Sequence, residues 1–370
     1  MSALSSTSSR RRWQPLRSLS QAARAYLRVR QDPRPKVAYV GGWLGKDNLG
    51  DELLYDAMGA LCPHVQFVHF AGGRVARSFL RTLPGIRAGV LGGGTLIAQK
   101  RQWLETALEF TASGRELVVF GSGVEESEFW AGDTTVADWK PLLSRCRTLG
   151  VRGPLSVQLL EAAGLKHATV VGDPVLALAS RTIEPNPRPR TLGLNLGVSD
   201  GKLWGDEARV GREMEQLAAR AKAAGWAVEW FVIWPKDLEL TRKVAAASGT
   251  ADCIHVVCRD YRDFMRRVAP LTAFVGMKLH ATALATCALT PSVMLEYRPK
   301  CRDYMQSIDQ DAATFRTDQF TADGVWELVD RWGASRPAVV DTLARGVWRA
   351  QDRQRAAAAA TPHLNASKGN

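Results

Sequence analysis

The sequence predicts an α/β protein made of two similar Rossmann-like domains that face each other across a cleft. Apolar runs of strand length alternate with longer amphipathic stretches, which is typical of βαβ units around a parallel sheet. A segment with a proline at every second position divides this series into two halves. With 370 residues, of which 46% are hydrophobic, the chain is long enough to form two cores.

In chain order, we expect five regions: a basic arm that is disordered or an amphipathic helix (1–35), a first domain (36–180), a linker (181–191), a second domain (192–335), and a C-terminal helix with a polar tail (336–370). Strands of the first domain are predicted at 36–41, 65–70, 86–92, 116–121, 147–152 and 168–171. Those of the second are predicted at 192–197, 227–233, 252–257, 271–276 and 291–295. Helices are predicted between them, for example over 206–224, 260–269 and 336–355.

The net charge of +12 belongs mainly to the N-terminal arm. Residues 1–36 hold eight Arg and Lys36 against Asp32 alone, a net +8, so the rest of the chain carries only +4. A nearly neutral body argues against nucleic acid as a partner. Apolar residues recur at helical spacing from Trp13 to Leu27. Segment 1–34 is therefore expected to contact an anionic membrane peripherally or to pack on the body as an amphipathic helix, with a transit peptide as a third interpretation.

The six cysteines are scattered and form no C-x-x-C pair. Cys253 and Cys258 are expected in one strand at an odd offset, on opposite faces, so we predict buried, reduced cysteines and no metal site. The sequence contains no apolar run suited to a secretion signal or a bilayer span. We therefore expect a cytoplasmic protein.

A glycine-rich loop over 41–52 follows the first strand and leads into a helix. Its spacing fits neither a P-loop nor a dinucleotide-binding fingerprint, but backbone N–H groups at a helix start favour an anion. Asn48 and Asp51 are candidate ligand contacts here, with helix capping as the structural alternative. The third strand ends in Gly92-Gly93-Gly94, which allows another chain segment or a ligand to approach the backbone.

Two further strand ends carry charged residues. Arg152 lies between a strand and a helix, where it can pair with a carboxylate or phosphate, or remain a surface arginine. Asp173 lies in a Gly-Asp-Pro turn, where it can act as a general acid or base or cap the turn. In the second domain, Lys278 and His280 begin a helix of small residues. A helix N-terminus lowers the pKa of a nearby histidine, so His280 is a candidate base or proton relay.

Taken in order, these segments resemble the polysaccharide pyruvyl transferase family. Five pieces carry the resemblance: Asn48-Leu49-Gly50-Asp51-Glu52, Gly92-Gly93-Gly94, Val151-Arg152-Gly153-Pro154-Leu155-Ser156, Gly172-Asp173-Pro174, and Lys278-Leu279-His280-Ala281 followed by Pro291. Together they cover about 36–310.

The resemblance implies a fold similar to that of two-domain GT-B glycosyltransferases. It also implies transfer of a pyruvyl group from phosphoenolpyruvate to a sugar of a polysaccharide or its lipid-linked precursor, giving a cyclic ketal with no cofactor. In that chemistry His280 and Asp173 would be catalytic and Asp51 would bind the acceptor. The donor would be held by five residues: Arg152, Lys278, Gly93, Gly94 and Asn48.

The chain departs from the family at one position, because the family usually has Arg where this chain has Lys278. Lysine supplies the positive charge but lacks the planar guanidinium group, which can form two parallel hydrogen bonds to a carboxylate or phosphate. Two other functions stay open: a GT-B glycosyltransferase with a nucleotide-sugar donor, and a non-catalytic member of the fold that binds a glycan. If the side chains of Lys278 and His280 point away from the cleft, the non-catalytic, glycan-binding function is favoured.

Overall fold

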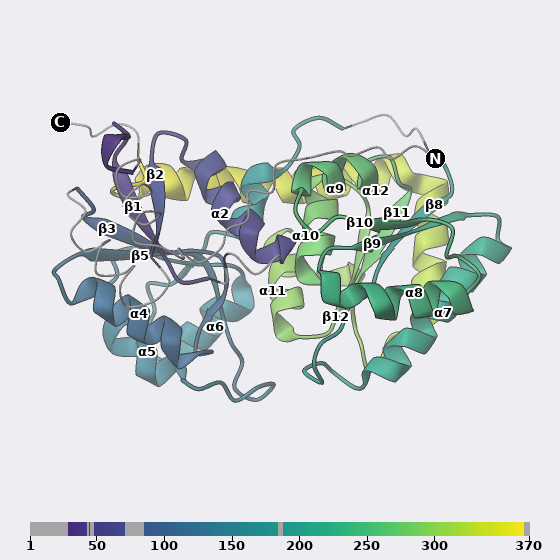
Figure 1. The fold of residues 1–370 in the computed structure, drawn as a ribbon, viewed down its shortest axis with the longest axis horizontal. Helices are drawn as coiled ribbons and strands as arrows, with labels where there is room; N and C mark the ends of the chain where they lie inside the picture. Colours follow the sequence, from purple (N-terminus) through teal and green to yellow (C-terminus); the bar gives the residue numbers. More distant parts are fainter. Residues whose placement is uncertain (1–28, 43, 45–47, 71–84, 184–187, 366–370) are drawn as a thin grey trace, which may run out of the picture.

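The computed structural model describes residues 29–42, 44, 48–70, 85–183 and 188–365, which form two α/β domains lying side by side (Figure 1). Each domain is built on one sheet whose paired strands all run parallel. The predicted fold class is thereby confirmed. Most of the predicted arm and the middle of the predicted linker lie outside the described residues.

The first sheet has the strand order β2-β1-β3-β5-β6-β7, with β4 paired to β5 beside this path. Its strands are β1 (Lys36–Val40), β2 (Gln66–Phe70), β3 (Ala88–Leu91), β4 (Gly94–Ile97), β5 (Glu116–Val124), β6 (Leu149–Val151) and β7 (Thr169–Val170). The six predicted strands are confirmed, although β6 and β7 are shorter than predicted. The sequence does not predict β4, whose glycine-rich start is typical of a loop. It forms because β5 extends to Val124 and offers it a partner.

Alternate residues of β1 enter two different cores. Ala38 and Val40 pack with residues of α4 and α5, whereas Val37 and Tyr39 pack with residues of α2. These helices therefore cover opposite faces of the sheet (Figure 1). The helices of this domain are α2 (Leu49–Leu61), α4 (Arg101–Thr111), α5 (Val136–Leu143), α6 (Pro154–Ala162) and the 3₁₀ helix η1 (Pro174–Leu178).

The second sheet has the order β10-β9-β8-β11-β12-β13, which is the Rossmann order with its switch point between β8 and β11. The predicted helices 206–224 and 260–269 and the five predicted strands are confirmed, and β13 is an unpredicted three-residue strand.

Because β10 is short, Cys253 and Cys258 flank it, which corrects their predicted placement in one strand. The strands are β8 (Thr191–Asn195), β9 (Ala227–Val232), β10 (Ile254–Val256), β11 (Ala273–Gly276), β12 (Ser292–Glu296) and β13 (Thr314–Arg316). The helices are α7 (Glu207–Ala223), η2 (Pro235–Asp237), α8 (Leu238–Ala247), α9 (Tyr261–Val268), α10 (Leu279–Cys287), α11 (Pro299–Ser307) and η3 (Asp311–Ala313).

A long C-terminal helix, α12 (Ala322–Ala360), runs along both domains (Figure 1). It is interrupted at Ser335, whose φ of −127° and ψ of 25° are not helical, and Pro337 follows shortly after. The predicted helix 336–355 is therefore the second half of a longer element. This half returns to the first domain, and Leu364 beyond its end enters the core behind β1.

Helix α10 lies between the domains and is buried on nearly every side. Eight of its nine residues are buried, and most are small, so it packs closely on α2 and η1 as well as on its own sheet. A helix that is apolar all round requires such cover. None of the helices among the described residues is long and apolar enough to cross a bilayer.

Candidate active site at the domain junction

The first turn of α2 lies at the junction between the two domains. Asn48 caps this helix, because its Oδ1 accepts a hydrogen bond from the Gly50 backbone N–H at 3.1 Å. Its Nδ2 donates to Asp51 Oδ2 at 2.8 Å. The structure therefore shows Asn48 as a helix cap that also positions the Asp51 carboxylate.

His280 packs directly on this turn from the second domain. A Cβ on Gly50 would overlap the imidazole Nδ1 and lie 2.9 Å from its Cγ. The Nε2 atom is buried and has no hydrogen-bond partner among the described residues. Burial lowers the pKa of His280 to about 4. Asp173 opposes this pKa shift, whereas the cations of Lys300 and Arg152 add to it. The imidazole is therefore neutral at neutral pH and able to accept a proton.

Asp51 shows the opposite effect of the same environment. Burial raises the pKa of Asp51 to about 6, the Lys300 cation acts against that rise, and Glu52 adds to it. A carboxyl group that titrates near pH 6 can carry a proton and release it, as a general acid must. Asp51, His280 and Lys300 are termed the junction group below.

Lys300 is a member of this group that is not among the site residues predicted from the sequence. It lines a cavity of about 160 Å³ between α6 and α11, together with Glu126 and Asp303. Its Nζ lies 5.0 Å from the centroid of the Tyr297 ring, and it forms no ion pair with any residue that the structure describes. Its position at the carboxyl end of β12 is a signal that could have identified it, because the same rule singles out Lys278.

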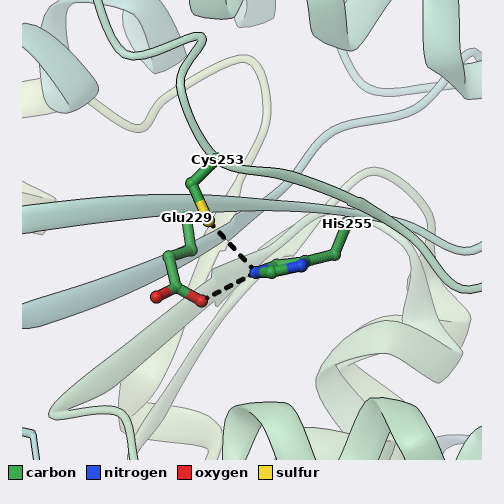
Figure 2. Close-up of side chains that lie close together, drawn as sticks. All are labelled: Glu229, Cys253 and His255. Carbon is green, nitrogen blue, oxygen red and sulfur yellow. Dashed lines mark hydrogen bonds and ion pairs between the residues drawn. The ribbon is translucent and has the colours of Figure 1, made fainter.

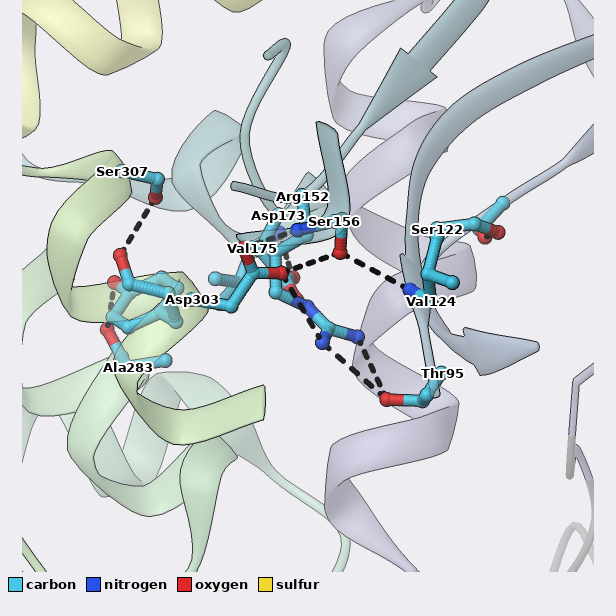
Figure 3. A network of polar contacts seen from close by, with 12 residues as sticks. Thr95, Ser122, Val124, Arg152, Ser156, Asp173, Val175, Ala283, Asp303 and Ser307 are labelled. Atoms are coloured by element: carbon cyan, nitrogen blue, oxygen red, sulfur yellow. Dashed lines mark hydrogen bonds and ion pairs between the residues drawn. The ribbon is translucent and has the colours of Figure 1, made fainter. Parts of the chain in front are cut away.

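Arg152 is fully buried, with a side chain that is 1% exposed. Its Nε donates to Asp173 Oδ2 at 3.1 Å, and both terminal nitrogens lie 3.3 Å from Thr95 Oγ1 (Figure 3). Asp303 Oδ2 lies 4.0 Å from Nη1. The guanidinium lies across Gly123, where a Cβ would be 2.7 Å from its Cζ. Arg152 is thus a buried residue whose charge is met by carboxylates of the protein, and the surface alternative is wrong.

The two carboxylates around Arg152 come from different domains. Asp303 belongs to α11, and it accepts hydrogen bonds from the Ser156 N–H at 3.1 Å and the Ser156 Oγ at 2.7 Å at the start of α6. Burial raises the pKa of Asp303, and Arg152 opposes that rise. Asp173 caps η1 by accepting from the Val175 N–H at 3.1 Å. The capping alternative for Asp173 is therefore present in the structure, alongside its pairing with Arg152.

The glycine run at the end of β3 provides room for side chains of its own domain. A Cβ on Gly92 would lie 2.6 Å from the Tyr39 hydroxyl, and one on Gly93 would lie 2.8 Å from Leu54 Cδ2. Gly94 has a φ of +92°, which favours glycine. The predicted close approach is thus made by packed side chains at Gly92 and Gly93, whereas a Cβ on Gly94 would come no nearer than 3.7 Å to Leu96 Cδ2.

Lys278 faces a different part of the molecule from His280. Its N–H donates to Asn195 Oδ1 at 3.0 Å, and its Nζ donates to the Val198 carbonyl and lies 3.5 Å from Asp237 Oδ1. Burial raises the pKa of Asp237 to about 6, and Lys278 acts against this. Lys278 therefore lies over the switch point of the second sheet, paired with a carboxylate of its own domain, whereas His280 points to α2.

A separate polar cluster lies at the β10 edge of the second sheet (Figure 2). His255 Nε2 lies 2.9 Å from Glu229 Oε2 and 3.2 Å from Cys253 Sγ. These three side chains are potential metal ligands that lie close together. Two cations contact the same groups, since Arg188 pairs with Glu229 and Arg267 lies 3.3 Å from His255 Nδ1. An arginine donor at Nδ1 leaves the imidazole proton on Nε2, facing Glu229, which favours a hydrogen-bonded cluster over metal ligation.

The fold is that of the GT-B class. A putative UDP-N-acetylglucosamine 2-epimerase from Listeria monocytogenes superposes with a TM-score of 0.57 at 12% identity, over 91% of this chain and 98% of that one. UDP-GlcNAc 2-epimerase from Neisseria meningitidis, bound to UDP-GlcNAc, gives a TM-score of 0.53 at 9% identity, over 86% of this chain and 97% of that one. At these identities the likeness establishes the fold alone.

The model of the polysaccharide pyruvyl transferase family matches residues 48–299, which is more than half of the 370 residues. The chain therefore belongs to the polysaccharide pyruvyl transferase family and is a transferase. This confirms the resemblance that the five sequence segments indicate. No curated protein sequence matches the chain.

Two glycines of α2 test the contact between α2 and His280. Gly50→Ala should lower the free energy of unfolding and the activity together, because its Cβ would overlap the imidazole. Gly59→Ala is the matched control in the same helix, since a Cβ there meets nothing within 4 Å. It should raise the free energy of unfolding by about 0.5–1 kcal/mol. Urea denaturation of both variants measures this, and two variants of equal stability would contradict the contact.

Arg152→Ala tests the buried charges between the domains. It should lower the free energy of unfolding by about 3–5 kcal/mol, because it leaves two buried carboxylates without their cation. Arg147→Ala, an exposed control just before β6, should stay within about 0.5 kcal/mol. A carboxyl whose pKa is raised on folding destabilises the protein only above its unfolded pKa, so the loss in Arg152→Ala should shrink as pH falls toward about 4. Equal losses in the two variants would show that Arg152 is not a structural counter-ion.

Proposed function

We propose that this chain transfers a pyruvyl group from phosphoenolpyruvate to a sugar of a polysaccharide or its lipid-linked precursor and forms a cyclic ketal. Family membership supports the class of reaction. The junction group supports the chemistry most directly. The neutral imidazole of His280 and the Asp51 carboxyl that titrates near pH 6 are both influenced by one cation, Lys300, which has no ion pair among the described residues.

The proposed reaction needs two opposite proton transfers. A sugar hydroxyl adds to the central carbon of phosphoenolpyruvate while the methylene carbon gains a proton and becomes a methyl group. A second hydroxyl then displaces the phosphate, and its proton leaves with that group. In this proposal Asp51 donates the proton to the methylene carbon and His280 accepts the proton of the first hydroxyl. Transfer of one proton from His280 back to Asp51 then restores the neutral imidazole and the protonated carboxyl for the next turnover. The sequence suggests Asp51 as a residue that binds the acceptor sugar. This proposal assigns it the role of general acid instead.

Lys300 is the cation that this proposal assigns to the donor. Phosphoenolpyruvate carries a carboxylate and a phosphate, and a charged hydrogen bond to either is strong in a partly buried site. Arg152 and Lys278, the donor ligands expected from the sequence, already pair with Asp173 and Asp237. The N-terminus of α2 adds backbone N–H groups beside Asp51. In this assignment Arg152 and Asp173 position the junction group and do not contact the donor.

Phosphate release in the presence of phosphoenolpyruvate and a panel of sugar acceptors tests the reaction. We expect His280→Ala to lower turnover by about 10²–10⁴-fold, the usual loss for one general base. His167→Ala, an exposed histidine of the first domain, is the control and should be fully active. Turnover of His280→Ala within about threefold of the wild type would remove His280 from the mechanism. Release of a nucleoside diphosphate from a nucleotide-sugar, without use of phosphoenolpyruvate, would support the glycosyltransferase alternative.

The pH profile tests the pairing of Asp51 with Lys300. The value of kcat/KM should rise as pH increases through about 4, where His280 loses its proton, and fall through about 6, where Asp51 loses its own. Lys300→Ala should move the falling limb to higher pH, because the cation that lowers the pKa of Asp51 is gone. It should also lower kcat/KM by about tenfold or more through loss of a charged contact. Lys300→Arg should restore both properties, and a falling limb that stays in place would contradict the pairing.

We also propose that the enzyme works in the cytoplasm at the inner face of the membrane, held there by residues 1–34. Support for this comes from the sequence, since eight Arg against Asp32 give this segment a net charge of +7. Each basic residue near an anionic surface contributes about 1 kcal/mol. Co-sedimentation with anionic vesicles, compared between the full chain and a chain without 1–34, measures the effect.

A further inference from the structure

Three cations from three separate segments gather around the indole ring of Trp130. Lys202 Nζ lies 3.7 Å from the ring centroid, Arg298 Cζ 5.6 Å and Lys100 Nζ 5.7 Å. Lys100 and Trp130 belong to the first domain, whereas Lys202 and Arg298 belong to the second. These four residues are termed the Trp130 cluster, and all four are partly exposed.

The cations of the cluster have no direct ion pair among the described residues, although Glu125, Glu126 and Glu128 lie shortly before Trp130 in the sequence. Arg298 Nε donates to the Lys202 carbonyl at 3.0 Å, which keeps these two cations together. None of the three cations forms an ion pair with a carboxylate in the part of the chain that the structure describes. Nearby Arg302, by contrast, pairs with Glu296 at 2.7 Å. Like charges on one ring repel each other, and an anion bound among them removes that repulsion.

The cluster is next to the candidate active site. Arg298 Cζ lies 5.4 Å from the centroid of the Tyr297 ring, and Lys300 Nζ lies 5.0 Å from the same centroid. Lys300 also lines the cavity between α6 and α11. The ring of Phe129 meets that of Trp204 edge-on at 4.7 Å, which holds the Trp130 loop of the first domain against the second. A substrate that reaches the cavity can therefore extend onto the cluster.

We propose that the Trp130 cluster binds the diphosphate group of the acceptor, the group that links a sugar to its carrier. This inference rests on the proposed function, which requires a sugar acceptor beside the donor. A diphosphate carries negative charge on two adjacent groups and so matches several cations held close together. The indole offers an aromatic surface to the adjoining sugar ring. The donor is assigned to Lys300, so donor and acceptor anions occupy different cations.

Binding of inorganic pyrophosphate to the full chain, followed by calorimetry, tests the subsite without turnover. The double variant Lys202→Ala with Arg298→Ala should bind at least about tenfold more weakly than the wild type, since it loses two charged contacts. Lys202→Arg should retain binding. Lys243→Ala, an exposed lysine on α8, is the control and should bind like the wild type. Equal affinity in the wild type and the double variant, or displacement of pyrophosphate by phosphoenolpyruvate, would overturn the inference.

Kinetics with two kinds of acceptor distinguish a diphosphate subsite from a general effect of the substitutions. For a prenyl-diphosphate-linked sugar, the double variant should raise KM by about tenfold and leave kcat unchanged. For the same sugar as a neutral glycoside, KM should not change, and an equal rise would overturn the inference. A nucleoside-diphosphate sugar serves as a third acceptor. If the cluster recognises the diphosphate alone, the double variant should raise the KM for this acceptor as much as for the prenyl-diphosphate-linked sugar. Because pyrophosphate binding needs no catalysis, a failure of the phosphoenolpyruvate reaction leaves that test intact.

Discussion

The pairing of the buried Arg152 guanidinium with carboxylates of both domains is the interaction on which the rest of the structure depends. Asp173 contacts it within the first domain, and Asp303 reaches it from the second while binding the start of α6 through Ser156. Charges this deeply buried are tolerated only where each has its partners. The relative position of the two domains is therefore constrained at this point. Helix α12 reinforces it, because Gln354 donates to the Asp173 carbonyl at 2.8 Å.

The junction group follows from this fixed arrangement. Once the domains are held together, the small residues of α10 allow His280 to lie directly on Gly50, and both His280 and Asp51 are partly buried at the junction. Desolvation disfavours a charged form of either sign, so it lowers the pKa of the imidazole and raises that of the carboxyl. One physical cause thus shifts the two pKa values in opposite directions. The cation of Lys300 stabilises the charge that develops on Asp51 when its proton leaves.

Local patterns in the sequence predict the sheets and the charged residues at their carboxyl ends, but not the partners of those residues across the junction. Arg152 is recognisable as a strand-end cation, yet Asp303 lies 151 positions further along the chain, and only folding brings the two together. For the same reason the sequence suggests donor contacts for Lys278, whose carboxylate partner Asp237 becomes visible only in the structure. Lys300 obeys the strand-end rule but belongs to none of the five short segments that carry the family resemblance. The strand β4 depends on an extended β5, a tertiary effect that no local pattern shows.

The most direct test of the central claim is the place where phosphoenolpyruvate binds. A crystal structure of the complex should show a carboxylate or phosphate oxygen of the donor within hydrogen-bonding distance of Lys300 Nζ, with the methylene carbon facing Asp51. The Arg152 guanidinium should still contact Asp173 in that complex. A donor that lies instead on Lys278, over the switch point of the second sheet, with Lys300 uncontacted, would contradict the assignment of the junction group as the active site.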